Sequence, residues 1–297
     1  MSKGHLFRGA ILIIVGALLL LANMGFINPL FWWHVVQLWP VILIALGIRL
    51  LAKDSSVGNL LALIMIVSAL GYAGWVSQTT GPMELENFVR SEVMQDRVSQ
   101  GKLIVNFGDG TIRFSGDTEY FTQGKLDYYT NEPQWKYNQM DSSAELEISS
   151  ENHKGIRFGW LPFNNATRTW DISLNQKPEW DITLNSGACS ADIDLSQNNV
   201  KDFTLNTGAS DIKVKFGLQQ DTSNVKIRAG ASNIEIFIPK DTGIRLSMSG
   251  ALSSNNFEEI GLVKSGDVYT SAGYSEKSQR IEIDISAGVS NIKIIWY

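Results

Sequence analysis

The hydrophobic positions of the chain follow two patterns, one in its first quarter and one in the rest. The first quarter consists of long apolar runs, with no charged residue from Gly9 to Ile48 or from Ser55 to Met83. Crossing the hydrocarbon core of a bilayer takes about 20 predominantly apolar residues. The pattern therefore predicts transmembrane helices at about 6–27, 33–52 and 57–77.

The link between the first two predicted helices, GFINPLFWWH, combines Gly, Asn and Pro with aromatic residues. The former interrupt helices, and tryptophan favours the headgroup region of a bilayer. Pro40 is tolerated near the start of the second helix, or kinks that helix if it begins earlier. A cleaved signal peptide is an alternative for the first run, which the two further apolar runs disfavour.

The basic residues near these runs predict how the helices are oriented. Lys3 and Arg8 precede the first helix, and Arg49 and Lys53 lie between the second and third. Under the positive-inside rule, the N-terminus and this second junction are cytoplasmic. Three crossings then place the remainder of the chain outside the cytoplasmic membrane.

Beyond the predicted helices the hydrophobic period becomes two. In TLNTGASDIKVKF, apolar and polar residues alternate on either side of a small-residue turn. Such alternation is typical of half-buried strands. Related stretches are TLNSGACSADIDL, VKIRAGASNIEIFI and ISAGVSNIKIIWY, so one strand–turn–strand unit recurs along the chain.

The turns of these units contain glycines at a nearly fixed spacing. Gly187, Gly208, Gly230 and Gly250 are separated by 21, 22 and 20 residues, and Gly288 continues the pattern after an insertion. Glycine permits positive φ, and small neighbours let adjacent turns pack closely. We expect these glycines to be structural turns in a β-solenoid-like stack, since one unit cannot cover its own apolar face. An antiparallel β-sandwich is the alternative, because its strands have the same period.

Upstream, KLIVNFGDGTIRFSG is an early relative of the repeat, and Trp160 and Trp170 are expected to fill or close the N-terminal end of the stack. The stretch GDVYTSAGYSEKSQRIEIDIS predicts a hairpin excursion before the last turn. The expected organisation is a helical region at 1–78, a linker at 79–101 and an all-β domain at 102–297.

Charge and cysteine content limit the partners and the source of stability. Beyond Met83 there are 21 basic and 29 acidic residues, an excess that argues against nucleic acid as a partner. Cys189 is the only cysteine, so the predicted β domain has no internal disulfide.

The sequence offers few groups for catalysis. The histidines are His5, His34 and His153, and no zincin, serine-hydrolase, phosphate-loop or paired-cysteine motif is present. Cys189 has no sequence neighbour that would activate a thiol and takes the place of a small turn residue, which favours a structural role. We therefore expect that the protein is not an enzyme and that it binds no cofactor.

Acidic residues in the predicted strands could line up to bind Ca²⁺ through oxygen ligands. Solvated strand faces explain them more simply, because residues two apart share the polar face. The acids concerned are Asp192, Asp194, Asp211, Glu235, Glu282 and Asp284.

The two patterns together resemble a known combination of domains. RGAILIIVGALLLLANMGFI, followed by WWHVVQLWPVILIALGIRLL, resembles the membrane region shared by LiaI and LiaF proteins. The repeated LNTGAS units resemble the outer β domains of LiaF-like and toast-rack proteins. The residues that carry the first resemblance are Arg8, Gly9, Gly16, Trp39, Pro40 and Gly47.

This resemblance implies a bacterial cytoplasmic-membrane protein that modulates a membrane histidine kinase, without catalysis, in the response to cell-wall-active antibiotics. An envelope scaffold whose β stack binds wall polymer or another exposed partner is the alternative, because long repetitive faces suit that use equally well. A carbohydrate-active enzyme ranks last, because its acids would have to cluster.

Overall fold

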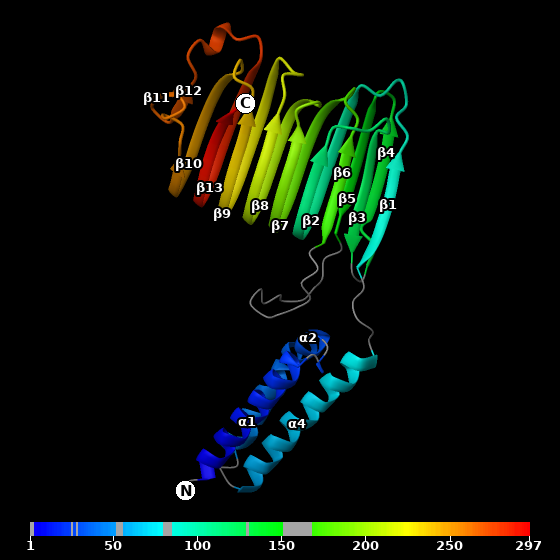
Figure 1. Cartoon of the computed structure of the whole chain (residues 1–297), viewed down its shortest axis with the longest axis vertical. Helices are drawn as coiled ribbons and strands as arrows, with labels where there is room; N and C mark the ends of the chain where they lie inside the picture. Colours follow the sequence, from blue (N-terminus) through cyan, green and yellow to red (C-terminus); the bar gives the residue numbers. More distant parts are fainter. Residues whose placement is uncertain are drawn as a thin grey trace. The chain divides into compact units, whose positions relative to one another are not determined.

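The protein was analysed as a computed structural model. The structure describes residues 3–24, 26–27, 29–51, 56–79, 85–128, 131–150 and 168–297. These residues form two compact units, a helical one within 1–84 and a β unit that begins at Leu85 (Figure 1).

The helices of the first unit are α1 (Lys3–Asn23), α2 (Pro29–Gln37), α3 (Trp39–Leu51) and α4 (Ser56–Thr79). The bounds predicted for the second helix, 33–52, are therefore wrong. Its first residue is Pro29, because proline suits the first position of a helix, where no N–H bond is needed. A break at Leu38 divides it, next to Pro40, which cannot donate the backbone hydrogen bond that would continue the helix.

Among the described residues, one helix is long and apolar enough to cross a membrane. Its window, Leu60–Ser77 in α4, has a mean hydropathy of 2.0. The apolar stretches of α1 and α3, Leu12–Asn23 and Trp39–Ile48, are shorter. The prediction of three crossing helices is thus not confirmed, and α4 is the single strong candidate.

The helical unit buries several alanines and exposes many of its large apolar residues. Ala45 of α3 and Ala62 of α4 are 2% and 0% exposed and share one apolar cluster, whereas Leu12 and Ile13 of α1 are 71% and 73% exposed. A water-soluble unit would bury such leucines and isoleucines, so this surface suits contact with lipid.

The β unit is one 13-stranded sheet. Its strands are β1 (Glu86–Glu92), β2 (Gln100–Ser115), β3 (Thr122–Tyr128), β4 (Gln134–Met140), β5 (Ser143–Ser149), β6 (Thr169–Leu174), β7 (Glu179–Leu195), β8 (Asn199–Phe216), β9 (Thr222–Ile238), β10 (Gly243–Asn255), β11 (Val263–Ser265), β12 (Val268–Thr270) and β13 (Arg280–Trp296). The long strands β2, β7, β8, β9, β13 and β10 lie side by side in that order and are parallel (Figure 1). Parallel ladders are those of stacked coils and not of an antiparallel sandwich.

Each of these long strands bends near its middle. In β8 the buried apolar positions that flank the bend are Phe203 and Leu205 before it and Ile212, Val214 and Phe216 after it, so they change from odd to even numbers. Alternation with period two holds on both sides, and the inward face is kept because the backbone turns a corner between them.

We call the half of a strand before its corner the first arm and the half after it the second arm. The rings of Phe203 and Phe216, on different arms of β8, lie 5.5 Å apart, so the two arms of one coil enclose the core. The short segments 196–198 and 217–221 then lead from one coil to the first arm of the next.

The order of strands in space differs from their order in the chain at one place. β13 pairs in parallel with β9 on one side and with β10 on the other, so it occupies the position between them. The excursion predicted before the last turn is present as the β11–β12 hairpin and the 3-10 turn Tyr274–Glu276. Its effect is to return the chain to an interior position of the stack.

The N-terminal end of the stack is assembled from short strands. The first arm of β2 pairs with β5 and its second arm with β6, so that β5 and β6 together take the place of one coil. β4 adds to β5, and β3 and β1 add beyond β6, all antiparallel. β1 lies inside the segment 79–101 that was expected to be a linker. This strand belongs to the β unit, because its Phe88 packs against the ring of Trp135.

Aromatic side chains fill this end. Trp170 packs against Phe107, and Trp180 against Phe121, with ring centroids 4.8 and 4.9 Å apart. Trp170 is 1% exposed and lies within the core, as expected, whereas Trp160 lies outside the described residues.

Candidate interaction surface

The corners of neighbouring coils pack through one column of glycines. A Cβ atom added at Gly208 would lie 2.6 Å from the carbonyl oxygen of Gly187, and one added at Gly230 would lie 2.6 Å from that of Gly208. The corresponding distances are 2.8 Å from Gly187 to Gly108 and 2.7 Å from Gly288 to Gly230. Real Cβ atoms do not approach a backbone oxygen this closely, so only glycine fits the column.

Close approach, and not positive φ, therefore explains the glycines of the column, none of which is among the described residues with positive φ. Gly250 differs from them: its φ is +154°, and it pairs with Ala287 instead of Gly288. It lies at the corner of β10 but one residue out of step with the column. The apparent period of the sequence conceals this offset.

A column of hydroxyl groups runs beside the glycines. The backbone N–H of Ser210 donates to Ser232 Oγ, and that of Ser232 donates to Ser290 Oγ, both at 3.2 Å. Cys189 continues the column, since its N–H donates to Ser210 Oγ at 3.1 Å and its side chain lies 3.3 Å from Ser186 Oγ. The cysteine thus occupies a serine position in a buried corner.

Asparagine side chains link the coils further along each arm. On the first arm, Asn206 Nδ2 donates to Asn185 Oδ1 and Asn185 Nδ2 donates to Asn106 Oδ1, each at 2.8 Å. On the second arm, Asn291 Nδ2 donates to Asn233 Oδ1, also at 2.8 Å. Such ladders satisfy each amide through its counterpart in the next coil.

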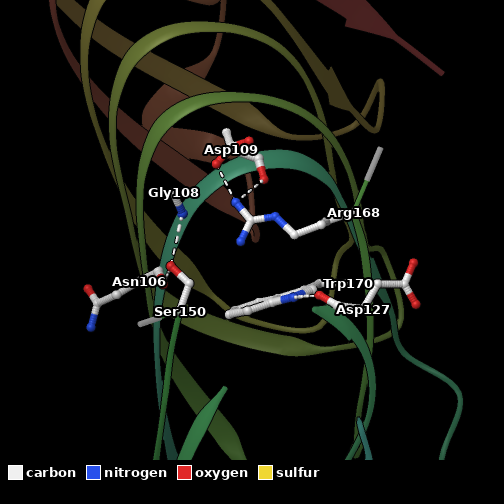
Figure 2. A network of polar contacts seen from close by, with 7 residues as sticks. All are labelled: Asn106, Gly108, Asp109, Asp127, Ser150, Arg168 and Trp170. Carbon is white, nitrogen blue, oxygen red and sulfur yellow. Dashed lines mark hydrogen bonds and ion pairs between the residues drawn. The ribbon is translucent and has the colours of Figure 1, made fainter. Parts of the chain in front are cut away.

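At the corner of β2, where the glycine column and the asparagine ladder end at Gly108 and Asn106, a polar network takes over (Figure 2). The N–H of Gly108 donates to Ser150 Oγ at 3.2 Å. Arg168 Nη2 donates to the carbonyl oxygen of Asp109 at 3.2 Å and forms an ion pair with its carboxylate. Ser150 and Arg168 follow β5 and precede β6, so they hold the corner where the neighbouring coil has no continuous strand.

Charges on the outer face of the second arms alternate in sign from strand to strand. Arg113 of β2 pairs with Asp171 of β6 at 3.3 Å. The whole row, in spatial order, is Lys125, Asp171, Arg113, Asp192, Lys213, Glu235 and Lys293. Opposite charges on adjacent strands stabilise the sheet and offset each other's field.

The outer face of the first arms is less balanced. Asp181 and Asp202 are neighbours in the ladder of β7 and β8, next to a bulge. Partial burial raises the pKa of Asp181, and the Asp202 carboxylate raises it further. Hydrogen bonds from Lys201 and Gln220 instead lower the pKa of Glu179.

The acids considered for Ca²⁺ lie on these outer faces and do not converge. Asp194 accepts hydrogen bonds from Ser196 and Lys215, and the Ser196 bonds and the Lys215 charge lower its pKa against the opposing effect of burial. Among the described residues, no three His, Cys, Asp or Glu side chains are placed to bind a metal together. His153 lies outside them.

Sequence reasoning did not find the Arg168–Asp109 pair. These residues are 59 positions apart, and Arg168 lies outside the repeated units. The one local signal is FGDG, in which a second glycine follows the column glycine: Gly110 has a φ of +124°, and a Cβ there would collide with the Arg168 backbone.

Two family models match the chain. The N-terminal domain of toast_rack, DUF2154, matches residues 83–237, and the LiaI-LiaF-like transmembrane region matches residues 6–51. The chain belongs to the toast-rack family, with a LiaI-LiaF-like membrane region at its N-terminus. Membership supports a membrane-anchored role at the cell envelope in a non-enzymatic family. A search of curated proteins found no match.

Solved structures include one with the same fold. It is a candidate cell adhesion protein from Clostridium sporogenes, 27% identical, with a TM-score of 0.65, and the match covers 72% of this chain and 100% of that one. A candidate adhesin from Bacteroides fragilis also matches, over 72% and 99% of the two chains, at 9% identity. Its TM-score of 0.26 is too low to support an argument.

Proposed function

We propose that the protein acts by contact, as a membrane-anchored sensor or modulator of a bacterial envelope-stress response, with a membrane histidine kinase as its partner. The observation that carries this proposal is the union of an apolar helical unit with a rigid stack in one chain. The corner groups of the stack are occupied in holding coils together, and its outer faces are long and regular. Such a chain acts by favouring one state of a partner over another.

The proposed topology has a cytoplasmic N-terminus, three crossings and the β unit outside the cytoplasmic membrane. Its support is the position of Lys3, Arg8, Arg49 and Lys53, together with the apolar window of α4. Reporters active only outside the cytoplasm should be active when fused after residue 83 and inactive when fused within 52–55. Activity at both positions would refute the topology.

The role itself is tested by deletion and co-purification. Deleting the gene should change the set point of a cell-wall stress reporter. A tagged full chain in detergent should co-purify with a membrane kinase, and a chain ending after residue 83 should retain part of that binding. An unchanged reporter across wall-active antibiotics, with no kinase recovered, would refute modulation.

Adhesion or scaffolding is the second candidate, and the likeness to the Clostridium sporogenes protein favours it. In that case the β unit binds wall polymer or another exposed partner. Sedimentation of the chain with purified cell walls, compared with a chain lacking 85–297, separates the two roles. Wall binding that requires the β unit, without an effect on the stress reporter, would favour the scaffold.

A further inference from the structure

A hollow lies on the outer face of the first arms at the C-terminal end of the stack. Its lining includes Asn224 and Lys226 of β9 and, three strands further on, Val268 of β12. In a flat sheet these strands would be about 14 Å apart, three strand spacings. The hollow therefore extends across the adjacent strands β9, β13, β10 and β12, the last of which adds antiparallel to β10.

Four charged side chains meet in this hollow. Lys226 of β9 is in register with Asp284 of β13, and Arg245 of β10 is in register with Glu282 of β13. The two carboxylates thus stand on the middle strand with one cation on either side. The hollow has no net charge but a strong local separation of charge.

The carboxylates are held by hydroxyl groups and not by these cations. Ser247 Oγ donates to Asp284 Oδ1 at 3.1 Å, and Tyr274 Oη donates to Glu282 Oε1 at 2.9 Å. No described residue forms an ion pair with Lys226 or Arg245. Residues in register on adjacent strands can form one, as Arg113 and Asp171 do elsewhere in the sheet at 3.3 Å. The ammonium and guanidinium groups are therefore available to a ligand.

We propose that this hollow binds a zwitterionic ligand, an amino acid or short peptide with both termini free. A simple anion would be repelled by the two carboxylates, and a metal cation by Lys226 and Arg245. A ligand carrying both charges satisfies all four groups. An extended dipeptide spans at most about 7 Å, which is enough to reach opposite charges on adjacent strands, one strand spacing of about 5 Å apart.

The probe is alanyl-alanine, titrated into the full chain in nanodiscs, with the dipeptide acetylated, amidated or both as comparison. Saturable binding is expected for the free dipeptide, and capping either end should weaken it at least about tenfold, the loss of one charge-assisted hydrogen bond. Free alanine is included because the hollow accommodates one residue or two. Equal binding of the doubly capped peptide, or no saturation by either free probe at about 20 mM, would overturn the proposal.

The variants Lys226→Gln and Asp284→Asn test the two charges separately. Lys226→Gln should reduce the discrimination against the C-terminal amide, since Arg245 remains, and Asp284→Asn should reduce the discrimination against the N-terminal acetyl group, since Glu282 remains. The matched controls are Lys213→Gln and Glu235→Gln, an in-register opposite-charge pair on the second arms, outside the hollow. If the controls lower dipeptide affinity as much as the hollow variants, the binding is non-specific and the proposal fails.

Discussion

The coils β7, β8, β9 and β13 and the N-terminal end of the same sheet are stabilised in different ways. In the coils, the corner glycines and serines contact their counterparts in the next strand, and so do asparagines such as Asn206 and Asn185, so the same contacts recur from coil to coil. At the N-terminal end the strands are short, and Trp170 and Phe121 fill an irregular core that Trp180, from the start of β7, completes. The repeated coils therefore need the smallest residues at their corners, and the N-terminal end of the stack needs the largest residues in its core.

This difference also decides what a substitution costs. In the glycine column, a larger side chain destabilises the sheet by a steric clash, since the backbone of one coil touches that of the next. An aromatic core fails by loss of volume, because a packed interior relaxes only partly into a cavity. The predictions below set these two modes of failure against each other.

The largest effect is expected at the N-terminal end. Trp180 is fully buried, and its indole N–H donates to the carbonyl oxygen of Asn175 at 2.8 Å. Trp180→Ala should destabilise the β unit by about 3–5 kcal/mol, the usual cost of such a cavity. The measurement is thermal unfolding in detergent, with Met140→Ala, at a 72% exposed position, as control. A similar midpoint for both variants would contradict the aromatic core.

The next effect is expected in the glycine column. Gly208→Val should cost about 1–3 kcal/mol by overpacking, because its side chain would meet the Gly187 carbonyl oxygen. Ala209→Val is the matched control: it adds the same kind of side chain one residue later, where the equivalent Val289 is 60% exposed. Equal loss in the two variants would show that the corner tolerates no valine anywhere and that close approach is not the reason.

A smaller effect is expected at Cys189, which takes the place of a serine in the column of hydroxyl groups. Cys189→Ser restores the residue found in the other corners and should change stability by about 1 kcal/mol or less. Ser210→Ala, which removes the hydroxyl that accepts the Cys189 N–H, should cost more. Unfolding midpoints in the opposite order would mean that the thiol has a role of its own.

The smallest effect concerns the outer face. Because the pKa of Asp181 is raised in the fold, ionising this group opposes folding above that pKa. Asp181→Asn should therefore raise the unfolding midpoint at neutral pH. The gain should shrink as the pH falls through the usual aspartate pKa of about 4 and vanish below it, where the wild-type carboxyl is protonated in both states. A gain that persists at low pH would contradict this cause.

Much of this architecture could be predicted from local pattern. The alternation around TLNTGAS predicts two half-buried arms, and the spacing of Gly187, Gly208 and Gly230 predicts their stacking. The interior position of β13 could not be predicted. All the coils have the same period and the same inward apolar residues, so local sequence does not determine which strand pairs with which.

The missed features of the surface have a similar cause. The Arg168–Asp109 pair and the charges of the hollow are brought together by register between strands far apart in the chain. The bounds of the second helix were wrong for a more local reason, the break beside Pro40. The extent of the linker was misjudged because β1 is recognisable as a strand only through its partner, β3.

The position of β13 imposes an order on assembly. β9 and β10 are made before it, yet neither can complete its pairing on the side that β13 occupies until Arg280–Trp296 has been synthesised. In the nascent chain, the place of one strand between β9 and β10 must therefore stay unfilled until β13 has left the ribosome. A premature stop before Arg280 would leave one long edge of β9 and one of β10 with unpaired backbone N–H and C=O groups, whereas a stop after the last coil of a sequential stack would leave only one such edge.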